Sequence, residues 1–279
     1  MIESILFEMD LDRVLGLAYW GQIDYLGESN GWPAKGWVNG SFDLSLQPKG
    51  TAYLLKSMFS DEPVVRIAII DKVAKEVVWN DVQVGTGVTG ESWNRPEGST
   101  LSMNVYTNCD RVDLILNGRT IASKENTMSP RSRNKLRFDN VAYAPGYLEA
   151  VAYRGGKAVA RHRLETTGEA KKLQLIPDDI EWQADGTDLM HVRVYAVDRK
   201  GRRVYAAQDE LTFTVEGDAR VVAVDNGNLY SHELHTGNVR RLYDGSALVI
   251  LRAGHTPGKV VLTVTDAAGK QAKVNLQTK

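Results

Sequence analysis

The sequence predicts a mainly β protein: two immunoglobulin-like β-sandwiches in tandem, preceded by a short α/β segment. Three observations support this class. After Asp61, apolar and polar residues alternate over many short segments, which is typical of half-buried strands. Asn117-Gly118 and the run 154–157 are signals of tight hairpin turns. Before Asp61, helical spacing and an unbroken apolar run replace this alternation.

The chain divides into three predicted parts. Residues 1–60 form the α/β segment, 61–168 the first sandwich and 169–279 the second. A short polar linker, 167–172, separates the sandwiches. Each sandwich closes with a strand, a tight turn that carries Gly-Lys, and a final strand, which indicates a repeated topology rather than a repeated sequence.

The α/β segment combines two predicted helices with one strand. Apolar residues at helical spacing predict a helix over 2–9, and a second helix lies within 48–63, a stretch that begins and ends with proline. The apolar run VLGLAYW, residues 14–20, predicts a strand buried on both faces. Because one such strand needs neighbours for its backbone hydrogen bonds, we expect this segment to be the tail of a larger α/β domain. Packing on the following residues or on a second copy of the chain, as a homo-oligomer, would cover its exposed edges.

Strand patterns fill the rest of the sequence. The predicted strands of the first sandwich are 64–70, 99–108, 111–117, 135–141, 147–154 and 157–166. Those of the second sandwich are 172–178, 189–198, 210–217, 220–225, 247–254, 259–269 and 270–278. Six or seven short strands in about a hundred residues are typical of an immunoglobulin-like sandwich.

The composition excludes several classes of function. The 279 residues are 43% hydrophobic and 25% charged, and 34 basic side chains face 35 acidic ones, for a net charge of −1. Such a balanced surface has no field of one sign that would attract nucleic acid or an anionic membrane. No apolar run is long enough to span a membrane, and the acidic first residues are unlike a secretory signal.

Motifs for metals and cofactors are missing. Cys109 is the only cysteine, so neither an internal disulfide nor a zinc site with two cysteines can form. The run His232-Glu-Leu-His235 is one residue short of the helical zinc motif, so a loop or capping role explains it better. No nucleophile elbow, Walker A loop or dinucleotide fingerprint occurs in a strand–helix context. We predict no metal and no cofactor.

Residues 17–37 are unusual because they hold three of the six tryptophans. The stretch mixes apolar, acidic and turn-forming residues, so the wall of a binding cleft explains it better than a buried core does. Trp20 ends the apolar run at the edge where α/β barrels build their active sites, and an indole there can stack on a sugar ring. For Trp32 and Trp37, anchoring of the loop is at least as good an explanation.

Asp24 and Glu28 lie in the same stretch and raise a second question. A retaining glycosidase needs two carboxyl groups about 5–5.5 Å apart. These two residues are four positions apart on a turn-rich loop, where no rigid element holds either of them. Structural hydrogen bonds for Asp24 and a position on the rim of the cleft for Glu28 are the stronger explanation.

A family resemblance is carried by the segment YWGQIDYLGESNGWPAKGWVNGSFDLSLQPKGTAYLLKSMFSDEPVV. It resembles the last strand, loop and helix of the (β/α)₈ catalytic barrel of glycoside hydrolase family 2, the β-galactosidase family. VDLILNGRTIASKE and VAYAPGYLEAVAYRGGKAVARHRLETTGE are similar to the sandwich that follows this barrel, and VVAVDNGNLYSHE and ALVILRAG to the terminal immunoglobulin-like domain. Residues 1–60 are then a remnant of the barrel.

The resemblance implies retaining hydrolysis of β-glycosides by two glutamates on earlier barrel strands. Neither glutamate motif is present in this sequence, so we predict no catalytic residue here and no activity of this chain alone. Trp20 matches the tryptophan that lines the subsite of the cleaved sugar, and Asn39 matches a segment near it. With Asp24 and Glu28 from the same stretch, these residues are the predicted substrate-binding set.

The resemblance also implies a carbohydrate partner, bound through the parent barrel, and a periplasmic or secreted protein. Two other functions stay open at this point. In a carbohydrate-binding or adhesion module, Trp79, Trp93 or Trp182 would form the binding platform, and Trp93→Ala or Trp182→Ala would abolish sugar binding. A pure spacer would bind no sugar at all.

Overall fold

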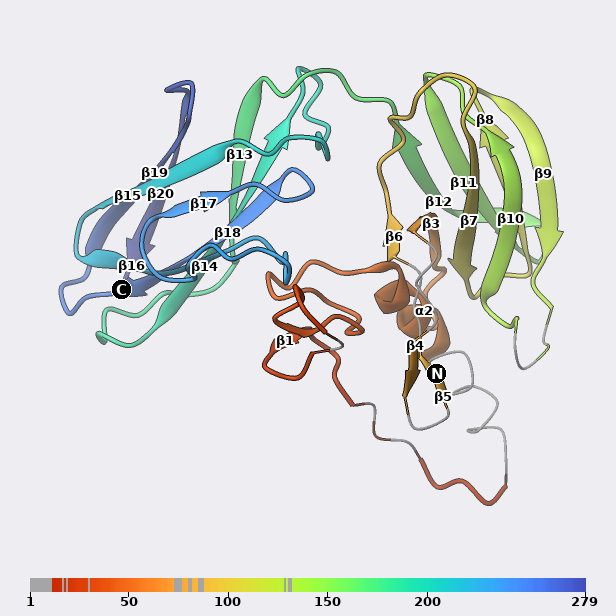
Figure 1. The fold of residues 1–279 in the computed structure, drawn as a ribbon, viewed down its shortest axis with the longest axis horizontal. Helices are drawn as coiled ribbons and strands as arrows, with labels where there is room; N and C mark the ends of the chain where they lie inside the picture. Colours follow the sequence, from red (N-terminus) through yellow and green to blue (C-terminus); the bar gives the residue numbers. More distant parts are fainter. Residues whose placement is uncertain are drawn as a thin grey trace. The chain divides into compact units, whose positions relative to one another are not determined.

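The computed structural model describes residues 12–16, 18, 20–29, 31–72, 77–79, 82–84, 88–127, 129 and 132–279. The described chain is mainly β, with two β-sandwiches that follow one another in sequence (Figure 1). This confirms the predicted fold class. The chain forms two compact units. The first contains Met1–Tyr25, Val38–Asp43 and Pro48–Thr166, and the second contains Leu26–Trp37, Leu44–Gln47 and Thr167–Lys279.

The sandwich of the first unit consists of two four-stranded antiparallel sheets. The order in one sheet is β10-β7-β3-β6, and in the other β12-β11-β8-β9. Their bounds are β3 (Val65–Lys72), β6 (Val88–Gly90), β7 (Thr100–Thr107), β8 (Arg111–Leu116), β9 (Arg119–Glu125), β10 (Lys135–Ala142), β11 (Tyr147–Arg154) and β12 (Lys157–Glu165). A separate hairpin pairs β4 (Val77–Trp79) with β5 (Val82–Val84). Strand β9 was not predicted, because it is a largely exposed edge strand without apolar alternation.

The core of this sandwich follows from the two-residue period of its strands. Ile67 and Ile69 of β3 and Val105 of β7 are fully buried and face the second sheet. The residues between them point to the opposite face, where Ala68 and Tyr106 are buried by a helix.

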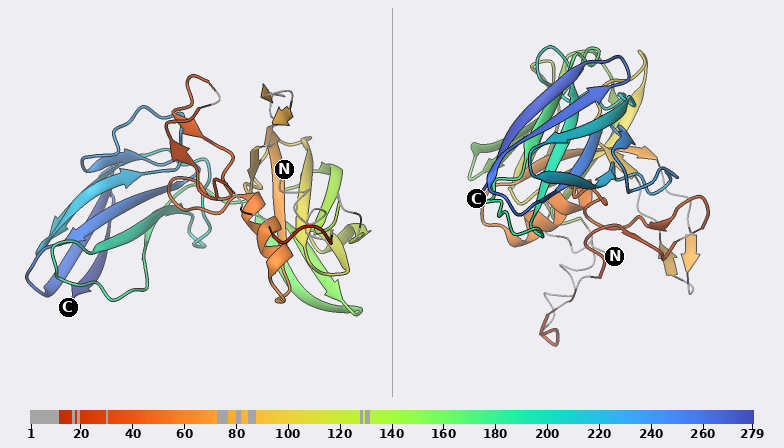
Figure 2. Two further views of the ribbon diagram at one scale, coloured as in Figure 1. Left: turned by 90° about the horizontal axis from the view of Figure 1, so that it is seen from below. Right: turned by 90° about the vertical axis from the view of Figure 1, so that its left-hand side faces the viewer.

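That helix is α2 (Gly50–Phe59), which confirms the helix predicted within 48–63. Its Leu54 packs on Ala68 and Tyr106, so the helix covers the outer face of the sheet that contains β3 and β7 (Figure 2, left, orange). Gly50 allows this close approach, since a Cβ there would lie 2.7 Å from the Thr89 hydroxyl and 3.0 Å from the Ala68 Cβ.

The sandwich of the second unit also has two four-stranded antiparallel sheets, ordered β13-β14-β18-β16 and β17-β15-β19-β20 (Figure 2, right). Their bounds are β13 (Lys172–Pro177), β14 (Leu189–Val197), β15 (Glu210–Glu216), β16 (Ala219–Asp225), β17 (Val239–Arg241), β18 (Ser246–Ala253), β19 (Gly258–Asp266) and β20 (Gln271–Thr278). Val192 and Val194 of β14, Leu251 of β18 and Phe213 of β15 are buried between the sheets. Trp182 closes one end of this core.

Two short stretches from the start of the chain pack on the second sandwich. In the longer one, residues 26–37, the N–H of Lys35 donates to the carbonyl of Leu229 at 3.0 Å. In the shorter one, residues 44–47, the side chain of Gln47 accepts a hydrogen bond from the Tyr195 hydroxyl at 3.0 Å. The strands β1 (Tyr25–Leu26) and β2 (Gly36–Trp37) close the longer stretch into a loop.

The strand predicted over 14–20 is absent at the described positions of that run. Leu15 is fully exposed and Trp20 is 83% exposed. The physical reason is that no described strand pairs with the run, so its backbone has no partners that would hold it extended. The helix predicted over 2–9 lies outside the described residues.

Candidate functional site

Asp24 is the buried centre of the predicted site and is 4% exposed. Both of its carboxylate oxygens lie 2.6 Å from the Lys49 Nζ, and its Oδ1 also accepts the N–H of Gly40 at 2.9 Å. The same Lys49 ammonium donates to the carbonyl of Val38 at 2.8 Å. Burial raises the pKa of Asp24, while the charge and hydrogen bond of Lys49 act in the opposite direction. Asp24 therefore anchors the backbone around residues 38–40.

This anchor fixes Asn39, which lies between the two residues that it holds. Gly40 is essential to the arrangement, because a Cβ there would lie 2.5 Å from the backbone nitrogen of Asp24 and 2.7 Å from the carbonyl carbon of Ile23. A further backbone hydrogen bond runs from the Asp24 N–H to the Phe42 carbonyl at 2.8 Å. Asn39 itself is half-buried. The turn that carries it is thus held from both sides.

The other two predicted substrate-binding residues, Trp20 and Glu28, are exposed. Trp20 belongs to the first unit together with Asp24 and Asn39, whereas Glu28 belongs to the second unit. Since both oxygens of Asp24 are occupied by Lys49 and Gly40, the contacts of this carboxylate favour the structural explanation over a role in a catalytic pair.

A carbohydrate-binding module would need exposed tryptophans on its sandwiches, but Trp93 and Trp182 are buried. Trp93 and Trp182 are each 1% exposed, and their indole N–H groups donate to the carbonyls of Ala144 and Asp188. They are core residues of the two sandwiches, so their predicted role as a sugar platform is wrong. The side chain of Trp79 lies outside the described part of the structure.

Trp32 is different, because it is 81% exposed. Its ring stacks on His232, with centroids 4.7 Å apart and an interplanar angle of 26°. Both residues belong to the second unit, so Trp32 lies against the second sandwich. Trp37 is half-buried in β2.

The loop that carries His232 is supported by Arg240, which the sequence did not mark as important, and by His235, for which the sequence predicted a loop or capping role. Arg240 is fully buried and donates to the Asn226 side chain at 2.9 Å. His235 Nδ1 lies 2.5 Å from a carboxylate oxygen of Asp225. Within the described residues there is no cluster of three or more side chains that could hold a metal ion. An arginine in a polar segment normally indicates surface, so only the three-dimensional contacts identify this one as a structural residue.

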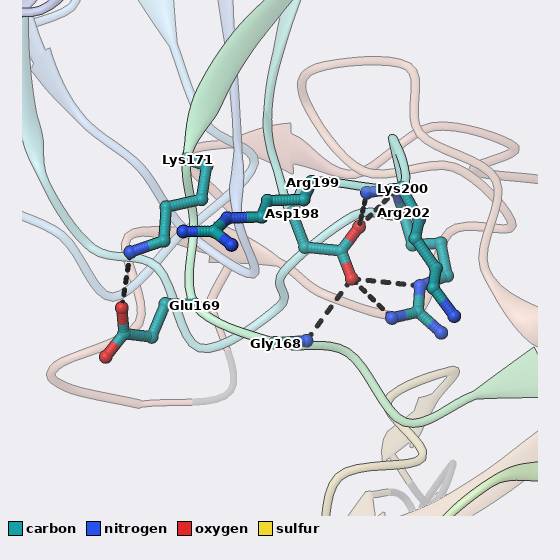
Figure 3. A pocket seen from close by; sticks show the side chains of 7 residues that line it. All are labelled: Gly168, Glu169, Lys171, Asp198, Arg199, Lys200 and Arg202. Carbon is teal, nitrogen blue, oxygen red and sulfur yellow. Dashed lines mark hydrogen bonds and ion pairs between the residues drawn. The ribbon is translucent and has the colours of Figure 1, made fainter.

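A cavity of about 360 Å³ lies where the polar linker enters the second sandwich (Figure 3). Asp198 lines it and accepts hydrogen bonds from the N–H groups of Gly168, Lys200 and Arg202 and from the Arg202 guanidinium. Burial opposes ionisation of Asp198, but these hydrogen bonds outweigh it and hold its pKa well below the ordinary value. Figure 3 shows the Lys171 ammonium directed at Glu169, with which it pairs at 2.6 Å. The hydrogen bond from the Gly168 N–H to Asp198, at 3.2 Å, joins the linker to its sandwich.

Comparisons with known proteins identify the family. Residues 173–275 match the model of glycoside hydrolase family 2 C-terminal domain 5, and residues 98–160 match a domain of unknown function, DUF4982. The β-galactosidase BoGH2A of Bacteroides ovatus is 30% identical over 277 residues, which are 98% of this chain and 30% of that protein. The chain carries the C-terminal β-sandwich region of glycoside hydrolase family 2.

Two further relatives extend this family 2 assignment. A β-glucuronidase of Formosa agariphila is 32% identical over 184 residues, which are 65% of this chain and 16% of that protein. The crystal structure of a family 2 member from Bacteroides cellulosilyticus matches with a TM-score of 0.83 and 32% identity, over 93% of this chain and 35% of that chain.

The family 2 region described here thus spans about a third or less of the length of each of these relatives. Their names imply carbohydrate substrates for the family. No helix in the described part of the chain combines the length and the apolar character that crossing a membrane requires.

Proposed function

We propose that this chain is the C-terminal part of a retaining β-glycosidase and that Trp20 contributes to the subsite of the cleaved sugar. The observation that carries the proposal is the 83% exposure of Trp20, four residues before the buried Asp24 anchor. An exposed indole this close in sequence to the anchored Asp24 can stack on the apolar face of a pyranose ring.

The Asp24–Lys49 ion pair supports a role for Asn39 in the same subsite. A side chain that fixes a sugar hydroxyl needs a precise position, and Asn39 is flanked by Val38 and Gly40, both held by this pair. Asp24 is then a positioning residue, and Glu28 is proposed for the rim of the subsite.

The reactive groups of this mechanism come from outside the chain in our proposal. Retaining hydrolysis uses one carboxyl group as nucleophile and another as acid and base, about 5–5.5 Å apart. A catalytic barrel would supply both carboxyl groups. Residues 1–60 would be the last segments of that barrel, and the two sandwiches would support the barrel. In this proposal, residues 61–168 and 169–279 are the two sandwich domains that follow the barrel.

We propose β-galactosides as the substrates. The relative that matches 98% of this chain is named a β-galactosidase, whereas the β-glucuronidase of Formosa agariphila matches 65%. These names describe a neutral and an acidic sugar, so a direct comparison of the two substrates is informative.

The test uses the full product of the gene that encodes this chain and, separately, the 279-residue chain. We expect the full product to hydrolyse nitrophenyl β-galactoside faster than nitrophenyl β-glucuronide, and the chain alone to hydrolyse neither. Asn39→Ala should lower kcat/KM about tenfold or more, whereas Asn275→Ala, at an exposed position of β20, should not change it. A full product without activity on either substrate would contradict the proposal.

A further inference from the structure

Trp32 is held out in solvent by a closed loop of the second unit. One face of its ring lies against the imidazole of His232, at a centroid distance of 4.7 Å. Because the side chain is nevertheless 81% exposed, the opposite face of the indole is open. Leaving such a large apolar surface in water costs free energy, so the position of this ring needs an explanation.

The loop around Trp32 has a defined conformation that produces this exposure. The Ser29 hydroxyl donates to the Ala34 carbonyl at 2.6 Å and accepts the Gly31 N–H at 3.0 Å. At the base of the loop, the N–H of Gly27 donates to the Lys35 carbonyl at 2.9 Å. Ala34, two residues after Trp32, is buried. The loop therefore buries Ala34 and leaves the ring of Trp32 in solvent.

The opposing loop, which carries His232, is equally well supported. The buried Arg240 donates from Nη1 to the carbonyls of Glu233 and Leu234 at 3.2 and 3.3 Å. Its Nη2 binds the side chain of Asn226, which is only 3% exposed. The two loops meet at the hydrogen bond from the Lys35 N–H to the carbonyl one residue before Tyr230. Trp32 and His232 thus stack where two hydrogen-bonded loops meet.

The polar ends of these aromatic side chains indicate what they bind. Among the described residues, none forms a hydrogen bond with the ring nitrogens of His232 or with the hydroxyl of Tyr230, which is 51% exposed. A pyranose ring has an apolar face of C–H groups surrounded by hydroxyls. It can stack on the open indole face while its hydroxyls bind the imidazole and the phenol.

We propose that Trp32, His232 and Tyr230 form a sugar-binding platform on the second sandwich for a pyranose unit of a β-linked oligosaccharide. The platform goes beyond the function proposed above, because it needs no catalytic group and lies in the second unit, whereas Trp20 lies in the first. It replaces the platform that the buried Trp93 and Trp182 cannot provide.

The experiment is a titration of the 279-residue chain with lactose at millimolar concentration, followed by the NMR signals of its six indole N–H groups. We expect the Trp32 signal, assigned by its loss in Trp32→Ala, to shift, and the signals of the buried Trp93 and Trp182 to stay. Trp32→Ala should weaken binding at least about tenfold, and Trp32→Phe should retain part of it. Phe59→Ala removes another exposed aromatic ring and should have no effect.

Three results would overturn the proposal. The first is a Trp32 signal that does not move with lactose, and the second is binding that persists unchanged in both Trp32→Ala and His232→Ala. The third is self-association of the chain that depends on Trp32 and is insensitive to lactose, which would make this surface an interface between copies. If the chain binds lactose but the full gene product is inactive, only the function proposed above is overturned. If the full gene product is active but the chain does not bind lactose, only the sugar-binding platform is overturned.

Discussion

The ion pair of Asp24 and Lys49 predicts unequal effects of removing either partner. Asp24 is 4% exposed and Lys49 is 29% exposed, so only the lysine can reach water when its partner is lost. Lys49→Met leaves a buried carboxylate without a counter-charge and should lower the free energy of unfolding by about 3 kcal/mol at neutral pH. Asp24→Asn keeps an acceptor for the Gly40 N–H and should cost about 1–2 kcal/mol. Urea denaturation measures both values.

The pH dependence of the Lys49→Met variant gives an internal check. Burial already raises the pKa of Asp24, and loss of the lysine charge raises it further. The folded variant therefore binds a proton more readily than the unfolded one, and its stability deficit should shrink as the pH is lowered towards the ordinary range of Asp. A deficit that is independent of pH, or a larger loss for Asp24→Asn, would contradict this account of the anchor.

His162 predicts a second pH effect, of opposite sign. Its Nδ1 accepts the N–H of Ile67 at 3.1 Å, and burial, together with the charge of Arg66, lowers its pKa from 6.5 to about 3. Between these two values the unfolded chain binds more protons than the folded one. Stability due to this residue is therefore complete above pH 6.5 and should fall by about 1 kcal/mol per pH unit below it.

The corresponding variant is His162→Asn, which keeps an acceptor for the Ile67 N–H but cannot be protonated. We expect its free energy of unfolding to depend less on pH between 6.5 and about 3 than that of the native chain. Chemical denaturation at several pH values gives both slopes. Equal slopes would show that His162 does not contribute to acid sensitivity.

At the scale of elements, the turn after β14 depends on a single carboxylate. Asp198 is 3% exposed and accepts five hydrogen bonds, which join this turn to the linker at Gly168. Asp198→Ala should cost about 3 kcal/mol of unfolding free energy, because it leaves the Arg202 guanidinium and three N–H groups without their acceptor. Asp198→Asn should cost less. Thermal and urea unfolding would contradict this if both variants were as stable as the native chain.

Acid should act on the same turn. The pKa of Asp198 is held below its ordinary value, so its contribution is present above the unfolded pKa of about 3.8 and is lost as the pH falls below it. This loss should be missing in Asp198→Asn. We therefore expect the chain to lose stability in acid in two steps. Protonation of His162 would destabilise the first unit, and protonation of Asp198 at lower pH would destabilise the second.

The elements were predictable where their pattern is local. Strands such as β14, with Met190, Val192 and Val194 buried on one face, are visible in the sequence as strict alternation. The polar edge strand β9 lacks that pattern and was missed. The apolar run 14–20 was predicted as a buried strand, yet burial depends on neighbours that no local pattern can supply, and none of its described positions belongs to a strand.

Side-chain roles were harder to predict than elements, because residue type does not determine exposure. Trp93 and Trp32 are the same residue type, but one fills a core and the other faces solvent. The anchoring role of Asp24 was among the explanations open at the sequence level, whereas its partner Lys49, 25 positions away, was not identified. Packing of residues 26–37 on the second sandwich also depends on contacts distant in sequence, such as the one from Lys35 to Leu229.

At the scale of the whole molecule, the two sandwiches have independent cores and similar layouts. Each pairs two four-stranded antiparallel sheets around one large buried tryptophan, Trp93 in the first and Trp182 in the second. The exposed groups that we assign to sugars, Trp20 and Trp32, lie outside both cores on segments that come before the first sandwich in the chain. The first sandwich is therefore a framework, and the stretch from 20 to 40, together with Tyr230 and His232 of the second sandwich, carries the recognition that we propose.

The most direct test of this account is the effect of Trp20→Ala on hydrolysis of nitrophenyl β-galactoside by the full gene product. We predict a decrease in kcat/KM of about tenfold or more, with full stability, because an exposed side chain that stacks on the sugar contributes to binding and not to folding. Phe59→Ala, the exposed aromatic control on α2, should leave kcat/KM unchanged. A Trp20→Ala protein with native kcat/KM would contradict the central claim that this tryptophan lines the sugar site.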